Sequence, residues 1–136
     1  MPSKKTYESR KFGQFAVMGV THKNEGMNMT RLEWIRKYVK YGAKFKLVRE
    51  PDNEVDHNAI KVKHALKSGK MITVGYVPNN EKRQLADEFA PLMDKFGWNP
   101  EMYFGRMFLI ETEEQAEKWD LPIGTITGMS VRYVKR

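Results

Sequence analysis

The chain has 136 residues, enough to bury one hydrophobic core but too few for two. Its 24 Lys and Arg outnumber its 17 Asp and Glu, and the net charge of +7 favours nucleic acid as a partner rather than a membrane, although basic composition also serves solubility alone. The absence of cysteine excludes disulfides, thiolate metal sites and a cysteine nucleophile. No apolar run resembles a signal peptide or a membrane span, so we expect a cytoplasmic location, at the nucleoid, or the nucleus of a eukaryote.

The chain begins with a polar segment and continues into a strand. Residues 1–11 are polar and basic, which predicts a flexible arm, and residues 12–136 are expected to form a single domain. The apolar, β-branched run from Phe12 to His22 predicts the first strand. The turn-rich stretch from Lys23 to Gly26 ends it.

A capping box predicts the first helix. Thr30 and Glu33 have the spacing at which each side chain satisfies a free backbone N–H, and Gly42 is a natural stop, so we expect a helix from Arg31 to about Tyr41. Aromatic residues flank its apolar face and basic residues lie opposite: Trp34, Tyr38 and Tyr41, then Arg36, Lys37 and Lys40. These rings are candidate platforms for bases, but aromatic residues beside an aliphatic stripe more often cover a core.

The middle of the chain predicts three strands and a second helix. The runs Lys44–Val48 and Ile60–Lys63 alternate at period two on either side of a polar loop, residues 49–58. A third strand spans Ile72–Val77, and a helix is expected to begin near Asn80. Apolar residues recur along this helix at the spacing of one face, at Leu85, Phe89, Leu92 and Phe96. We expect Pro91 to break or kink it, because proline removes a backbone donor.

The C-terminal part predicts a strand from Met102 to Ile110, a short acidic helix and a last strand from about Ile123 to Val134. Thr112 and Gln115 form a second capping box at the start of the acidic helix. Strands outnumber helices, so the predicted fold class is α+β, mainly β with α.

Two linked motifs carry the most information. Residues 47–62 read LVREPDNEVDHNAIKV, and residues 74–78 read VGYVP. Together they resemble the signature of the HIRAN domain family: an apolar strand, Arg-Glu-Pro, a small polar residue and Asn, then Asp, Asn-Ala and a second apolar strand, with Val-Gly-Tyr-Val-Pro leading into a helix. The likeness spans about Phe15 to Phe96.

The resemblance implies a small OB-like β-barrel of about six strands with two main helices and a short acidic helix. It implies a module of DNA repair or replication that binds nucleic acid, single-stranded DNA or free 3′ DNA ends, with a helicase, nuclease or other protein as partner. The loop from Asn53 to Asn58 would form one wall of the pocket. The candidate nucleic-acid-binding residues are His22, Arg49, Asn53, Asp56, Asn58, Lys61, Tyr76, Asn79 and Lys82.

The residues of this loop permit two interpretations, contact with a ligand or formation of turns. Carboxylate and amide oxygens can accept a hydrogen bond from a terminal hydroxyl, with Asp56 as the acceptor. The cations near the loop either hold phosphates or are simply solvated charges: Arg49, Lys61, Lys63 and Lys82. Asp and Asn also close turns by bonding their own backbone, a structural role that stays open for Asp56 and Asn58. Family members that read DNA ends carry aromatic residues at the positions of His22 and Val55. Loss of one stacking platform costs ~1–3 kcal/mol, so we expect a weaker or differently built pocket.

Other chemistry finds little support. Asp52, Glu54 and Asp56 mimic the first ligands of a calcium loop, but His57 and Lys63 stand where that loop needs glycine and glutamate. We find no P-loop and expect no metal, no cofactor and no enzymatic activity, a nuclease being the weakest reading. The competing function is a protein-interaction module, an adaptor or a virus-encoded inhibitor, that uses the barrel surface and the acidic helix at residues 113–120.

Overall fold

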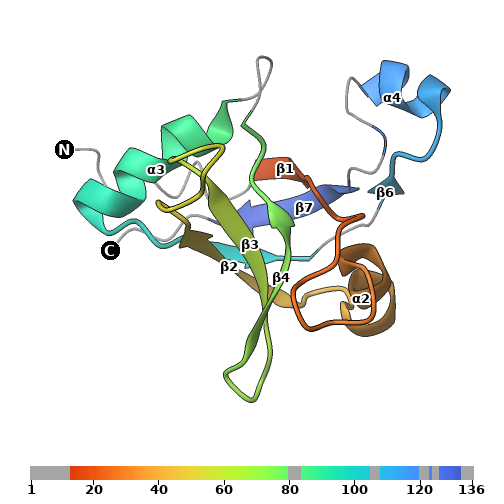
Figure 1. Ribbon diagram of the computed structural model, residues 1–136, viewed down its shortest axis with the longest axis horizontal. Coiled ribbons are helices and arrows are strands. Elements are labelled where there is room, and N and C mark those ends of the chain that lie inside the picture. Colours follow the sequence, from red (N-terminus) through yellow and green to blue (C-terminus); the bar gives the residue numbers. More distant parts are fainter. Residues whose placement is uncertain (1–12, 80–83, 105–107, 120–122, 124–125, 133–136) are drawn as a thin grey trace.

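The structure, a computed structural model, describes residues 13–79, 84–104, 108–119, 123 and 126–132 (Figure 1). The predicted arm at residues 1–11 and Lys82 lie outside the described residues. Within them the elements in chain order are β1 (Gly13–Val17), α2 (Arg31–Tyr38), β2 (Lys44–Arg49), β3 (Ile60–Ala65), β4 (Met71–Tyr76), α3 (Leu85–Phe96), β5 (Glu101–Tyr103), β6 (Phe108–Leu109), α4 (Glu113–Trp119) and β7 (Ile126–Arg132). No helix in these ranges has the length and apolarity needed to cross a bilayer.

The described strands form one seven-stranded sheet in which every pairing is antiparallel. The order is β1-β7-β5-β2-β3-β4, and β6 pairs with β7 off this path. A single bridge between Met18 and Tyr76, with N···O distances of 3.0 and 2.9 Å, connects the two ends of the sheet. The mixed α and β class is confirmed, but the expected barrel of about six strands is not formed. Beyond Met18 the chain bonds the start of α2 instead of β4, with Leu32 N–H donating to the carbonyl oxygen of Val20 at 2.7 Å.

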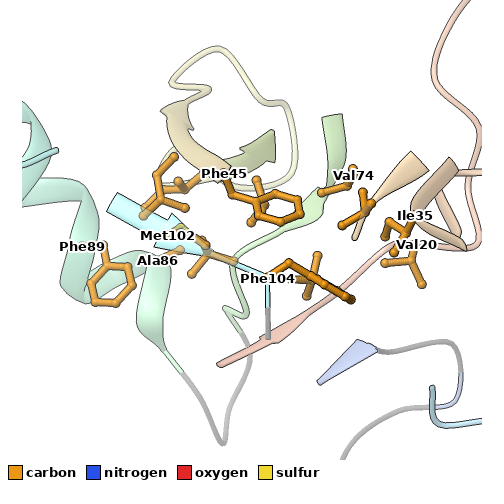
Figure 2. Close-up of a cluster of buried hydrophobic side chains, with 14 of the residues drawn as sticks. Val20, Ile35, Phe45, Val74, Ala86, Phe89, Met102 and Phe104 are labelled. Carbon is orange, nitrogen blue, oxygen red and sulfur yellow. The ribbon is translucent and has the colours of Figure 1, made fainter. Parts of the chain in front are cut away.

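The core lies on the inward face of the sheet, between the strands and helices α2 and α3. Alternation along β2 and β3 buries Phe45, Leu47, Ile60 and Val62. Figure 2 shows Ala86 and Phe89 of α3 near Met102, with Ile35 of α2 in the same cluster. Burying one such large apolar side chain contributes about 1.5–3 kcal/mol. The core therefore fixes which residues of β2 and β3 face outward.

Helices α2 and α4 begin as their capping residues predict. Glu33 N–H donates to Thr30 Oγ1 at 3.1 Å and Thr30 N–H to Glu33 Oε1 at 3.0 Å, which confirms the first capping box. Gln115 N–H donates to Thr112 Oγ1 at 3.1 Å, and Thr112 N–H returns the bond at 3.1 Å, which confirms the second. Helix α2 ends at Tyr38, before the predicted end at Tyr41.

The structure differs from two expectations on the C-terminal half. Helix α3 runs through Pro91 without a break to its left-handed cap at Gly97. Pro91 is exposed, so its missing donor lies on the solvent side of the helix. The strand expected from Met102 to Ile110 is instead two short strands, β5 and β6, which pair with different stretches of β7.

Glycine permits the closest approach between the sheet ends. A Cβ atom at Gly75 would lie 2.3 Å from Val17 Cγ1 and 2.5 Å from the carbonyl oxygen of Met18. No other residue could occupy this position without moving the backbone. The approach brings the segment after β1 against the end of β4, where the candidate site lies.

Candidate nucleic-acid interface

A cleft of about 650 Å³ opens at the end of β4, between the segment 18–31 and the loop after β2. Its size falls in the range typical of small-molecule sites and suits a nucleotide. The predicted residues that line it are His22, Asn53, Asp56, Tyr76 and Asn79. Arg49, Asn58 and Lys61 are not part of the lining.

The loop wall of the cleft is held by its own side chains. Asn53 Oδ1 accepts hydrogen bonds from the backbone N–H groups of Val55 and Asp56, both at 2.9 Å, and its amide donates to Glu50 Oε1 at 2.6 Å. Asp56 Oδ1 accepts from the N–H of Asn58 at 2.9 Å. These are Asx-type turns, so Asn53 and Asp56 shape the wall as well as line it.

Arg49 holds the same loop by hydrogen bonds made outside the cleft. Its guanidinium donates to the carbonyl oxygens of Ala59 at 2.8 Å and His57 at 3.0 Å. The same group forms an ion pair with Asp94 of α3 at 3.1 Å. Because these partners lie on both segments, Arg49 links the loop to α3.

A second link joins the loop to the start of α3 through Asp87. Asn58 and Asn79 donate to Asp87 Oδ1 at 2.9 and 3.1 Å. These two hydrogen bonds lower the pKa of the Asp87 carboxyl. Asn79 also donates to Asp56 Oδ2 at 2.6 Å, so a continuous chain of hydrogen bonds runs from α3 to the cleft.

Glu50 forms the centre of a third cluster beside the cleft. Lys61 Nζ lies 2.6 Å from Glu50 Oε2, and the hydroxyl of Tyr76 donates to Oε1 at 3.1 Å. Burial raises the pKa of Glu50, but the bonds from Lys61, Asn53 and Tyr76 together outweigh it and hold the pKa below its ordinary value. The bond to Glu50 raises the pKa of Lys61. Burial, followed by the bond to Glu50, raises the pKa of Tyr76, which stays a neutral donor.

The opposite wall contains two cations that the sequence analysis missed as site residues, Lys23 and Arg31. Arg31 donates from Nε to Asn24 Oδ1 at 2.9 Å and from Nη1 to the carbonyl oxygen of Gly19 at 3.0 Å. Its guanidinium carbon lies 5.5 Å from the centroid of the Tyr76 ring, in cation–π geometry. The sequence marked Arg31 only as the start of a helix, and no spacing pattern connects it to the VGYVP motif.

The apolar residue at the mouth of the cleft is Val55, which is 96% exposed. His22 is exposed on the other wall. The aromatic row of α2 lies elsewhere: Trp34 packs against the core and donates from its indole N–H to His64 Nδ1 at 3.1 Å, and Tyr38 stacks on Trp34 with centroids 4.3 Å apart. Trp34 therefore has a structural role, and the cleft contains Tyr76 as its aromatic ring.

Comparison with known proteins identifies the family. The HIRAN domain family matches residues 12–107, so the chain belongs to the HIRAN domain family, whose members are nucleic-acid-binding modules. A crystal structure of the HIRAN domain of human HLTF is similar, with a TM-score of 0.55 and 20% identity over 93% of this chain and 78% of that one. At this identity the likeness shows a shared fold. No curated protein matches the chain.

Proposed function

We propose that the cleft binds the 3′ end of a single-stranded DNA and that the chain is a binding module without catalytic activity of its own. The observation that carries this proposal is the meeting of two cations, Lys23 and Arg31, with the carboxylate of Asp56 in one cleft. Cations suit the phosphate backbone, and a carboxylate suits a terminal hydroxyl. An isolated phosphate would instead be repelled by the carboxylate.

Asp56 keeps capacity for a ligand despite its two protein partners. A carboxylate offers about four acceptor sites. Asn58 N–H and the Asn79 amide occupy one site on each oxygen. A 3′-hydroxyl can donate to a remaining site, whereas a 3′-phosphate would place negative charge against the carboxylate. The proposed preference for a free hydroxyl therefore follows from Asp56.

Arg31 supplies the phosphate contact in this arrangement. Its guanidinium has five N–H donors, and its hydrogen bonds to Asn24 and to the carbonyl oxygen of Gly19 use Nε and Nη1. These bonds and the ring of Tyr76 fix its orientation, so little rotamer freedom remains to be lost on binding. Lys23 adds a second, longer-reaching charge to the same wall.

The test compares three labelled oligonucleotides of equal length: one single-stranded sequence that ends in a 3′-hydroxyl, the same sequence with a 3′-phosphate, and a hairpin whose 3′ end is base-paired. We expect tightest binding to the 3′-hydroxyl, and weaker binding to all three as salt rises. Asp56→Ala should remove the preference for the hydroxyl, while Glu54→Ala, at an exposed neighbouring position, should retain it. Equal binding to the three ends, or binding that does not respond to salt, contradicts the proposal.

A second candidate function rests on α4. None of the residues of this helix is buried, and Glu113, Glu114 and Glu117 are exposed. Figure 1 shows α4 projecting from the region of β6, away from β2 and β3. An acidic exposed helix suits a basic protein partner. A purified partner whose binding resists nuclease and is lost on reversal of these three charges would favour this function over DNA binding.

A further inference from the structure

The outward face of β2 and β3 is a row of lysines. Because Phe45, Leu47, Ile60 and Val62 point into the core, the alternate residues of the two strands face outward. The outward lysines are Lys44 and Lys46 on β2 and Lys61 and Lys63 on β3. Lys46 and Lys63 are direct cross-strand partners.

This pairing is unfavourable in the protein alone. Like charges directly opposite each other on a sheet are destabilising, and both lysines are only partly exposed to water. Lys61 is neutralised by Glu50 at 2.6 Å, but Lys44, Lys46 and Lys63 form no ion pair with any side chain described in the structure.

The lysine row is continuous with the cleft. Lys61 pairs with Tyr76 across β3 and β4, and Tyr76 lines the cleft. Lys63 follows two residues along β3, a step of about 7 Å. At the far end of the row, Lys44 lies opposite Tyr103 of β5. Four lysines therefore lie between Tyr76 and Tyr103 on the face that leads away from the cleft, and cations flanked by aromatic rings suit a flexible single strand.

We propose that Lys46 and Lys63, with Lys44, form a second contact site, which binds the phosphates of the single strand several nucleotides away from the end held in the cleft. This inference rests on the proposed function, because the cleft sets where the strand starts. The anion relieves the repulsion between the paired lysines, which explains why the two charges face each other. The site is indifferent to base sequence, since lysine reads phosphate as a point charge.

The experiment measures binding of 3′-hydroxyl oligonucleotides of about 4 and about 16 nucleotides, lengths that bracket known single-strand site sizes. The variant Lys46→Gln/Lys63→Gln should bind the long oligonucleotide roughly tenfold more weakly and lower the salt slope by about 1.4, because each single-strand phosphate contact contributes about 0.7. Affinity for the short oligonucleotide should not change. The variant should be at least as thermally stable as the parent, because a like-charge pair is removed.

The matched control is Lys67→Gln/Lys70→Gln, which removes the same charge from the exposed β3–β4 turn. Equal loss in both variants would show a general effect of net charge and overturn the second site, as would an unchanged affinity for the long oligonucleotide. Failure of the proposed function looks different: the parent protein would show no preference for a 3′-hydroxyl at either length. A length-dependent loss that persists in that case would support the lysine face and reject the cleft.

Discussion

The two walls of the cleft are built in opposite ways. In the loop wall, the amide of Asn53 and the carboxylate of Asp56 bond neighbouring backbone N–H groups. In the opposite wall, Arg31 is oriented by two bonds to its own segment and lies over Tyr76. The comparison teaches that polar residues of a sequence motif can hold a loop in shape, while the cations that line the same cleft come from a segment outside the motif.

The largest expected effect tests the scaffold role of the loop wall. Asn53→Ala removes an acceptor shared by two backbone N–H groups and a donor to Glu50. We expect a loss of about 2–3 kcal/mol in the free energy of unfolding, measured by urea titration, because three hydrogen bonds of about 1 kcal/mol each are lost. The exposed neighbour provides a control: Asp52→Ala should change stability by about 0.5 kcal/mol or less. Equal effects would mean that the loop is not held by Asn53.

The next effect separates the walls by binding. Arg31→Ala should weaken binding of a short 3′-hydroxyl oligonucleotide about thirtyfold, or ~2 kcal/mol, because a charge-assisted contact is lost. The affinity of Arg31→Lys should lie between those of the parent protein and Arg31→Ala, because lysine keeps the charge but lacks the planar guanidinium. Fluorescence anisotropy measures all three. Binding that survives in Arg31→Ala but disappears in Asp56→Ala would reverse the assignment of the two walls.

A smaller gain is expected at the mouth of the cleft. Val55 is exposed and offers no ring for a base to stack on. Val55→Tyr should tighten binding about fivefold, or ~1 kcal/mol, at the low end of base stacking on an aromatic side chain. Glu54→Tyr places the same ring one residue away and should give no gain. A similar gain from both variants would indicate nonspecific stacking rather than a platform at the cleft.

The smallest effect concerns His64 of β3, which connects that strand to Trp34 of α2, the helix that begins at Arg31. Burial lowers the pKa of His64, so the neutral ring accepts the hydrogen bond of Trp34. As pH falls below the ordinary histidine value of about 6.5, the unfolded chain takes up the proton first, and stability is lost. We expect the free energy of unfolding to drop by about 1 kcal/mol or less between pH 7 and about pH 5. His64→Gln, which keeps an acceptor, should lack this drop; an equal drop in both proteins would assign it to other groups.

Local patterns in the sequence predicted the parts of the fold that depend on neighbouring residues. The spacing of Thr30 and Glu33 located the start of α2, and alternation located β2 and β3, because both signals act within a few residues. The same reasoning could not find the contact between Arg31 and Tyr76, which depends on how distant segments meet. It also could not decide between contact and turn formation for Asn53 and Asp56, because the same oxygen atoms serve both.

The bridge between Met18 and Tyr76 is a seam of two hydrogen bonds, whereas β2 and β3 are paired along their length. The seam is also held by packing, because Val17, one residue before Met18, is buried in the core and lies against Gly75. Both halves of that seam border the cleft. Widening of the entrance would therefore separate Val17 from Gly75 as well as break the two hydrogen bonds, so the shape of the cleft is coupled to the packing of the hydrophobic interior.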